Sequence, residues 1–517
     1  MEKYKSLDAL NAAWGTAFWA QTYTDWKQVF LPQPTVTYHN PSHLLDFYRF
    51  TSETAVAFAE MQYVLLKEAA PAQFVTHNGI FGNIDYQTFT ERTVDFLSYD
   101  SYPTFQLMRQ DLPIKEKDKL SGKHLSRVRG YSSKFLILEQ QAGPGGQTGN
   151  VLNDDRDDYL QVSPKPGQLR LWTWQSIAHG ADGVLYFRWR TCPYGAETLW
   201  HGLNDYGNQP NRRLREAKRI AEETNRLSSL IVGTSVHASV AIVTDYDNDS
   251  NCKIDRHTGF EYWRSEENIY LALSARHIGV DVIDRKEGEK EGRLENYDMV
   301  FLPNAQLMER EDVSRLSAYA KHGGTVIFGP RSGYKNRKNH AHMLPFPGVL
   351  KELSGIAVED FTMVTESELQ RIRFAGGTVA SAPLLHEILQ PEREDVHIAA
   401  EYEADYYAGR PAITIRPYGK GKIVYCGTFF TLDNAAALLD HLDAQDGFAA
   451  WGQLPPEVEA VYRIDQDGRR YAIILNYSDH SAKVVLKKPL HDLLNRQNLE
   501  YECQLEPYAI RWLLLEE

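Results

Sequence analysis

The stretch "SSKFLILEQQAG", residues 132–143, decides the fold because it places a carboxylate at the end of an apolar strand. Residues 135–138 form an unbroken apolar run, which is typical of a strand buried on both faces. Glu139 ends that run and two glutamines follow it. A polar group at the carboxyl end of a buried parallel strand is typical of the active face of a (β/α) barrel.

The same pattern recurs through the first part of the chain. Strand-like segments alternate with helix-like segments, which predicts a parallel sheet. The predicted strands are 73–79, 94–103, 134–140 and 181–190, and the predicted helices include 41–69, 86–93, 170–180 and 211–231. Their carboxyl ends carry Asn78, Asp100, Tyr102, Glu139, Arg188 and Trp189. Polar groups on successive strands favour a barrel over a flavodoxin-like sheet, in which such groups gather at one switch point.

Two further domains are predicted after the barrel-like part. A second α/β pattern begins near residue 236 and indicates a doubly wound, flavodoxin-like sheet. From about residue 456 the pattern changes to alternating apolar and polar residues around the turn "DQDG", which indicates a small antiparallel β domain. Residues 331–410 resemble a loop and are the least readable part of the chain. We therefore expect domains at 1–232, 233–450 and 451–517.

Composition excludes several classes of protein. The net charge is −13 and the pI is near 5.8, which argues against nucleic acid or an anionic membrane as the main partner. The N-terminus has no apolar signal core, and no run of about 18 apolar residues occurs. The four cysteines are scattered without metal-ligand spacing. These features predict a cytoplasmic protein without a metal or other cofactor.

The barrel-like part is half the expected size. A TIM barrel needs eight strands, and four are predicted before residue 235. An isolated half-barrel would leave two unpaired sheet edges. We therefore expect the chain to be the C-terminal part of a longer protein; the alternative is an unusual half-barrel protein.

Several sequence blocks carry a family resemblance. "VDFLSYDSYP", "LILEQQAG" and "GAETLWHGLNDYGNQPNRR" lie in order between about residues 5 and 225 and resemble family 42 glycoside hydrolases, the bacterial β-galactosidases. The resemblance implies a TIM barrel, an α/β domain that forms homotrimers, and a small β domain. It also implies retaining hydrolysis of terminal β-D-galactosides, such as lactose, galacto-oligosaccharides or plant galactans.

The resemblance implies that Glu139 is the nucleophile. Retaining glycosidases need two carboxyl groups about 5–5.5 Å apart, one as nucleophile and one as acid/base. The family acid/base lies in an Asn-Glu-Tyr context, and no such tripeptide occurs in this sequence. The family's zinc-binding cysteine cluster is also absent, as are the tryptophans that often follow the nucleophile. Both the acid/base and the cysteines precede the matching region in the family, in keeping with the expected truncation.

Five other residues are candidates for binding the sugar, and each has a structural alternative. Tyr102 and Asp100 end the same predicted strand; Tyr102 orients Glu139 by a hydrogen bond, and the structural alternative for Asp100 is a cap on the following loop. Asn78 lines the sugar site or closes a turn with Gly79. Trp189 stacks on a sugar face or fills the barrel mouth. The remaining two, Glu197 and His201, bind sugar hydroxyls or begin and cap a helix.

Two alternative functions stay open. An α-L-arabinopyranosidase of the same family would act on a substrate that differs from a β-galactoside only at C6. A catalytically inactive sugar-binding or structural half-barrel would be no enzyme. We predict the β-galactosidase, with galactoside substrate and no nucleic-acid or membrane partner.

Overall fold

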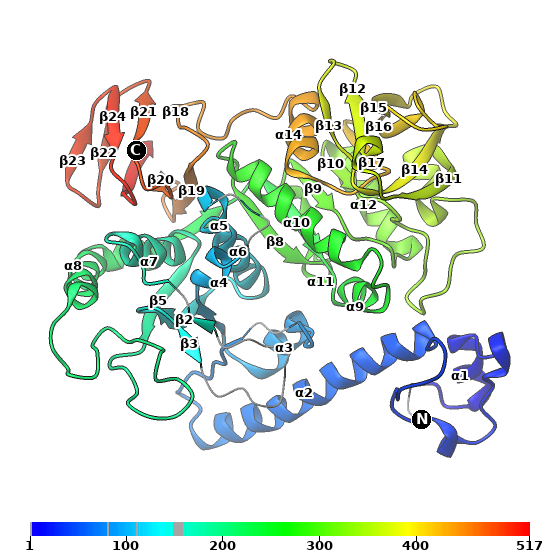
Figure 1. Cartoon of the computed structure of the whole chain (residues 1–517), viewed down its shortest axis with the longest axis horizontal. Helices are drawn as coiled ribbons and strands as arrows, with labels where there is room; N and C mark the ends of the chain where they lie inside the picture. The colour runs from blue at the N-terminus through cyan, green and yellow to red at the C-terminus, as the bar shows by residue number, and fades with distance from the viewer. Residues whose placement is uncertain are drawn as a thin grey trace.

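The computed structural model describes residues 3–79, 82–109, 112, 114–147, 159–160 and 162–516, without the side chains of residues 114, 115, 159, 160 and 516. Three lobes are visible (Figure 1). The barrel-like lobe and the long helix α2 occupy the lower part of the view, the α/β domain the upper right, and the terminal β domain the upper left. No helix in these ranges is long and apolar enough to cross a membrane.

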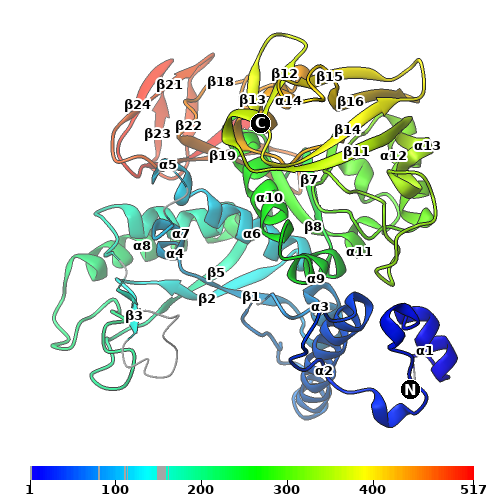
Figure 2. The ribbon, with the colours of Figure 1, turned by 45° about the vertical axis from the view of Figure 1, so that its right-hand side comes forward.

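A parallel three-stranded sheet forms the centre of the first lobe. Its order is β1 (Leu97–Ser101), β2 (Phe135–Gln141) and β5 (Ala181–Phe187). Helices α6, α7 and α8 lie on one side of it (Figure 2). These and the shorter elements are α3 (Tyr86–Thr93), α4 (Thr104–Leu107), α5 (Ile114–Lys117), α6 (Leu120–Tyr131), β3 (Gly146–Gln147), β4 (Tyr159–Leu160), α7 (Gln168–Ala178) and α8 (Arg212–Gly233). The lobe is the C-terminal half of a TIM barrel, as predicted.

The predicted strand 73–79 is not a regular strand. It runs beside β1 as an extended segment, because Asp95 N–H donates to Val75 O at 2.9 Å and Ser98 N–H to His77 O at 3.1 Å. Two widely spaced bonds do not make a ladder, so the prediction of a strand is wrong. The segment nevertheless delivers Asn78 to the carboxyl end of β1.

The predicted helix 41–69 is confirmed as α2 (Pro41–Ala69), with Asn40 as its N-cap. Ahead of it, Ser6 caps α1 (Leu7–Trp14), which ends at Gly15 in the left-handed region. Trp14 is buried and stacks on His43 at 4.5 Å between ring centroids. One face of α2 stays exposed and apolar; it carries Phe50, Phe58, Met61 and Leu65.

The second lobe is built around a mixed sheet. Its parallel part has the order β8-β7-β9-β10-β17, the flavodoxin-like arrangement that the sequence predicts. The elements are β7 (Val240–Thr244), α9 (Tyr246–Ile254), α10 (Gly259–Ser274), β8 (Val280–Asp284), α11 (Arg285–Gly288), β9 (Met299–Leu302), α12 (Arg310–His322), β10 (Thr325–Phe328), β17 (Gly421–Cys426) and α14 (Leu432–His441).

The unreadable region 331–410 is mainly β structure. Strands β16, β15, β12 and β13 extend the sheet antiparallel from β17, and β11 pairs with β14 in a separate ribbon. The elements are α13 (Lys351–Ser354), β11 (Ile356–Val364), β12 (Arg371–Phe374), β13 (Val379–Ser381), β14 (Leu384–Pro391), β15 (His397–Tyr402) and β16 (Pro411–Tyr418).

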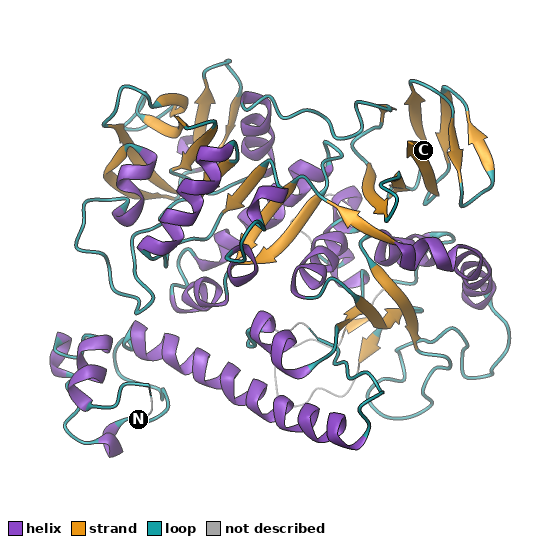
Figure 3. Cartoon of the chain, turned by 180° about the vertical axis from the view of Figure 1, so that it is seen from behind, coloured by secondary structure: helices purple, strands orange, loops and turns teal. Residues whose placement is uncertain are grey.

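The third lobe is antiparallel throughout its strand pairs, as predicted, and Figure 3 shows its strands from behind. Its larger sheet also takes β6 (Thr234–His237), which precedes the α/β domain in the chain and pairs with β19. The other strands are β18 (Gly452–Gln453), β19 (Val458–Asp465), β20 (Arg470–Asn476), β21 (Ala482–Leu486), β22 (Leu490–Asp492), β23 (Gln497–Leu499), β24 (Glu502–Leu505) and β25 (Ile510–Glu516).

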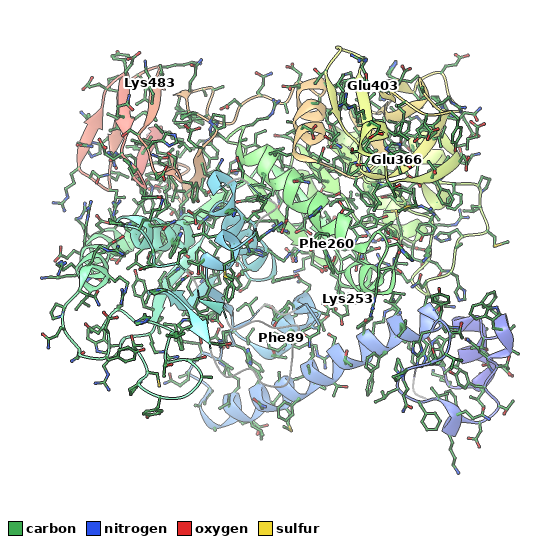
Figure 4. All side chains as sticks on the ribbon, viewed as in Figure 1. Phe89, Lys253, Phe260, Glu366, Glu403 and Lys483 are labelled. Atoms are coloured by element: carbon green, nitrogen blue, oxygen red, sulfur yellow. The ribbon has the colours of Figure 1, made fainter. Side chains whose placement is uncertain are left out.

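Buried polar contacts hold the three lobes together. Glu459 of β19 accepts hydrogen bonds from Tyr477 at 2.6 Å and from Tyr270 of α10 at 3.1 Å, and its carboxylate lies 3.4 Å from His179 at the end of α7. One carboxylate therefore joins all three lobes. Lys253, labelled in Figure 4, adds a contact between α9 and α2, with its ammonium 5.4 Å from the centre of the Tyr48 ring.

Candidate active site

Glu139 lies at the carboxyl end of β2 with its carboxylate hydrogen-bonded to a tyrosine. The Tyr102 hydroxyl donates to Glu139 Oε2 at 2.6 Å, which confirms the expected contact. Burial, and then the Glu139 carboxylate itself, raise the pKa of Tyr102 above its ordinary value, so the phenol stays protonated and keeps donating. The contact fixes one of the two carboxylate oxygens.

Two glutamines anchor the strand end that carries Glu139. Gln140 and Gln141 are both completely buried. Gln140 Oε1 accepts a hydrogen bond from Ser176 of α7 at 2.9 Å, and Gln141 Oε1 accepts one from the Thr104 hydroxyl at 2.9 Å. Because buried amides are costly unless paired, these contacts fix the backbone that directly follows Glu139. A rigid strand end suits a residue that must hold one orientation.

A second carboxylate lies beside Glu139 on the neighbouring strand. Asp100 of β1 is the register partner of Glu139, and its Oδ2 accepts a hydrogen bond from Asn78 Nδ2 at 2.8 Å. Burial first, and then the charge of Glu139, raise the pKa of Asp100 to about 6, although the Asn78 bond acts to lower it. Asp100 therefore pairs with Asn78. Within the described part of the chain it makes no hydrogen bond to the following loop, so its interpretation as a loop cap is wrong.

Trp200 forms an aromatic support behind Tyr102. Its ring is buried and meets the Tyr102 ring edge-on at 5.1 Å, with Phe105 6.1 Å from the same tyrosine. Trp200 comes from the loop after β5, so this loop reaches the nucleophile's hydrogen-bond partner through a packed ring. Sequence reasoning did not select Trp200, although its place inside "GAETLWHG" was a usable signal.

The other predicted residues lie on the rim formed by the loop after β5. Arg188 and Glu197 form an ion pair. His201 Nδ1 lies 3.2 Å from Asp205 Oδ1. Trp189 is 63% exposed, so it does not fill the barrel mouth. The exposed indole of Trp189 and the Glu197 carboxylate, which is paired with Arg188, lie together on this rim.

The structure thus sorts the predicted residues into two groups. Tyr102, Glu139 and Asn78 meet at the ends of β1 and β2, whereas Glu197, His201 and Trp189 form the rim. The loop that follows the nucleophile, from residue 148 to 158, lies outside the described residues. Within the described ranges, no group of three His, Cys, Asp or Glu residues is placed to hold a metal ion.

The arrangement supports nucleophilic chemistry by a carboxylate. Glu139 is held by a strand, a phenol donor and buried amides, and it faces the active end of a barrel sheet. A carboxylate so placed can attack an anomeric carbon and form a glycosyl ester. Of the described residues, only Asp100 places a second carboxylate in register beside it.

Family models cover all three lobes. The model described as beta-galactosidase of glycoside hydrolase family 42 matches residues 1–227. A beta-galactosidase trimerisation domain matches residues 238–448, and a beta-galactosidase C-terminal domain matches residues 457–513.

Relatives and solved structures agree with these matches. The beta-galactosidase BgaA of Clostridium cellulovorans is 30% identical over 520 residues, covering 100% of this chain and 75% of the relative. The beta-galactosidase bgaB of Geobacillus kaustophilus is 30% identical, covering 97% and 71%. A solved beta-galactosidase from Halorubrum lacusprofundi superposes with a TM-score of 0.85 at 29% identity, over 100% of this chain and 75% of that one. This chain is therefore a glycosidase that belongs to glycoside hydrolase family 42, the β-galactosidase family.

Proposed function

We propose that this chain carries the nucleophile of a retaining β-galactosidase that releases terminal β-D-galactose from lactose, galacto-oligosaccharides or plant galactans. The observation that supports it is the Tyr102 hydroxyl on Glu139 Oε2 at the carboxyl end of a parallel strand. In this proposal Glu139 attacks C1 through Oε1, and the glycosyl ester is later hydrolysed. Asn78, Trp189, Glu197 and His201 bind the galactose and its aglycone.

The nucleophile can be tested without a general acid. A 2,4-dinitrophenyl 2-deoxy-2-fluoro-β-D-galactoside has a leaving group that needs no proton, and its fluorine slows hydrolysis of the ester. Mass spectrometry of the treated chain should find the fluorosugar on the peptide that contains Glu139. Glu139→Gln should abolish the label, whereas Asp182→Asn, near the opposite end of the barrel sheet, should keep it. A label on another carboxylate would refute the assignment.

We also propose that a further (β/α) segment, not among these residues, completes the barrel and supplies the acid/base. Within the described residues, β5 pairs with a strand on one side only. Leu185 on that strand is 52% exposed, and a groove of about 270 Å³ lies between β5 and α8, lined by Val184 and Ile220 among others. Parallel sheets are normally covered on both faces, so the open edge and the exposed face of α2 suit such a segment.

This second proposal has its own test. The 517-residue chain should cleave dinitrophenyl β-galactoside much faster than lactose, because only the natural substrate needs a proton on its leaving oxygen. Rapid turnover of lactose by this chain, lost in Glu139→Gln, would place the acid/base inside it. Side-by-side rates on nitrophenyl β-D-galactoside and α-L-arabinopyranoside decide between the two substrate classes. A failure on both, with an unlabelled Glu139, would favour the inactive sugar-binding protein.

We propose further that the protein is a cytoplasmic homotrimer with the division 1–232, 233–450 and 451–517. The trimerisation-domain match supports assembly through the second lobe. Apolar side chains exposed there, including Met343, Phe361 and Met363, suit burial in an interface. Light scattering after size exclusion gives the mass directly; a monomer at micromolar concentration would contradict the trimer.

A further inference from the structure

Asp100 and Glu139 form an in-register pair of carboxylates on adjacent parallel strands. Neighbouring strands lie about 4.8 Å apart, and paired residues in a parallel ladder point to the same face of the sheet. The irregularity in the ladder between Tyr99 and Asp100 aligns Asp100 with Glu139 after Tyr99 has paired with Ile137. The backbone itself therefore brings the two carboxylates together.

Asp100 is poorly compensated as an anion. Asn78 donates to Oδ2, whereas Oδ1 is shielded from solvent and has no hydrogen-bond partner within the described residues. A carboxylate oxygen in that state is costly. Its pKa, about 6, reflects burial first and the charge of Glu139 second.

The other groups around Asp100 do not neutralise this pair. His77, on the extended segment beside β1, acts to lower the pKa of Asp100 when it is charged, but its side chain is exposed. The Tyr102 hydroxyl donates its hydrogen bond to Glu139 and not to Asp100. Glu197, on the loop after β5, adds negative charge near Tyr102. Tyr99 lies on β1 like Asp100, and its pKa is raised first by burial and then by the charge of Asp100.

We propose that Asp100 is a positioning residue that favours glycosylation of Glu139 through like-charge repulsion. The inference rests on the proposed role of Glu139 as nucleophile. In the step, Glu139 Oε1 bonds to C1, the bond from C1 to the leaving oxygen breaks, and the electron pair departs with the phenolate. Glu139 becomes a neutral ester, so its repulsion with Asp100 disappears. Water then attacks C1, the bond from C1 to Oε1 breaks, and the sugar and a proton are released, which restores the carboxylate and the repulsion.

The rate of labelling by the dinitrophenyl 2-fluorogalactoside tests the proposal. In the wild-type chain the rate should rise as pH increases through about 6, where Asp100 ionises. Asp100→Asn should lose this step and label about tenfold more slowly above it, since each pKa unit of repulsion relieved corresponds to about tenfold in rate. Asp182→Asn is a matched control, because Asp182 also has a raised pKa but lies near the far end of the sheet.

The thermal unfolding temperature gives a second test, which does not depend on the labelling reaction. Asp100→Asn should raise the thermal unfolding temperature above pH about 6, and by less in a Glu139→Gln background, because the repelling partner is then absent. Equal labelling rates and pH profiles for the wild type and a folded Asp100→Asn would overturn the role of Asp100 but leave Glu139 as the nucleophile. If Glu139 of the wild type takes no label, the nucleophile assignment and this inference both fail.

Discussion

The hydroxyl of Tyr102 lies 2.6 Å from Oε2 of Glu139, although 37 residues separate the two in the chain. The contact joins the residue just beyond β1 to the end of β2, and Trp200 packs against the tyrosine from a third loop. One phenol therefore couples the orientation of Glu139 to the loop after β5. The hydrogen bond is charge-assisted, which makes it stronger than a neutral one.

Tyr102→Phe should slow formation of the glycosyl ester without unfolding the chain. The phenol holds the carboxylate in one orientation. Because misplacing a reacting group by about 1 Å can cost on the order of 100-fold in rate, the labelling rate of Glu139 should fall about 10- to 100-fold. Tyr99→Phe removes a hydroxyl from β1, three residues before Tyr102, and should change the rate little. A Tyr102→Phe chain that labels at the wild-type rate would show that the phenol does not orient the nucleophile.

Asp284→Asn should stabilise the protein at alkaline pH. Burial, and then Asp245, raise the pKa of Asp284 to about 7, against about 3.9 in the unfolded chain. Because the folded-state pKa is the higher one, this contribution to stability is complete below about pH 4 and is lost as pH rises through about 7. Asparagine still caps α11, where Asp284 Oδ1 accepts from Lys286 N–H at 2.8 Å.

The gain should be on the order of 1–3 kcal/mol at pH 8 and should vanish in acid, as read from urea unfolding midpoints. Asp281→Asn on the same strand should act in the opposite direction. Burial tends to raise the pKa of Asp281, but the Arg129 ion pair at 2.6 Å outweighs it and the pKa lies below its ordinary value. Loss of stability in Asp284→Asn at pH 8 would contradict the upward shift of the Asp284 pKa.

Arg463→Met should destabilise the junction between the barrel lobe and the terminal domain. Arg463 is 1% exposed and donates to carbonyl oxygens of Ile177, Ile231 and Thr234 at 2.5, 2.9 and 2.7 Å. These carbonyls lie at the ends of α7 and α8, which need partners. Leaving them unpaired should cost about 3–5 kcal/mol. Arg469→Met, at a half-exposed ion pair, should cost less than about 1 kcal/mol in the same chemical unfolding.

The parts of the fold that the sequence could predict are those set by local chemistry. Pro41 with the Asn40 cap defines the start of α2, and the apolar run before Glu139 defines β2. Strands between residues 356 and 418 were not predicted because their order follows from distant pairing. For example, burial along β11 does not alternate, since Glu359, Asp360 and Phe361 are exposed in succession, and the strand is completed only by β14.

The same division holds for the site. Glu139 and Tyr102 stand out in sequence because each ends a strand-like segment with a polar group. Gln140 and Gln141 have complete burial and partners 36 and 37 residues away, which no local pattern records. The repulsive pairing of Asp100 with Glu139 depends on strand register, which is a property of the assembled sheet.

Gly130→Ala should weaken the packing of the barrel lobe on the α/β domain. Gly130 lies in α6, and a Cβ added there would lie 2.0 Å from the backbone oxygen of Val282 in β8, so the helix would have to move away. Ala ordinarily stabilises a helix by about 0.5–1 kcal/mol relative to Gly. A net loss in unfolding free energy would therefore come from the close approach of α6 to the backbone of Val282. Gly233→Ala at the end of α8 meets nothing within 4 Å and should be neutral or slightly stabilising. If both variants gained equally, the two lobes would not be in backbone contact at Gly130.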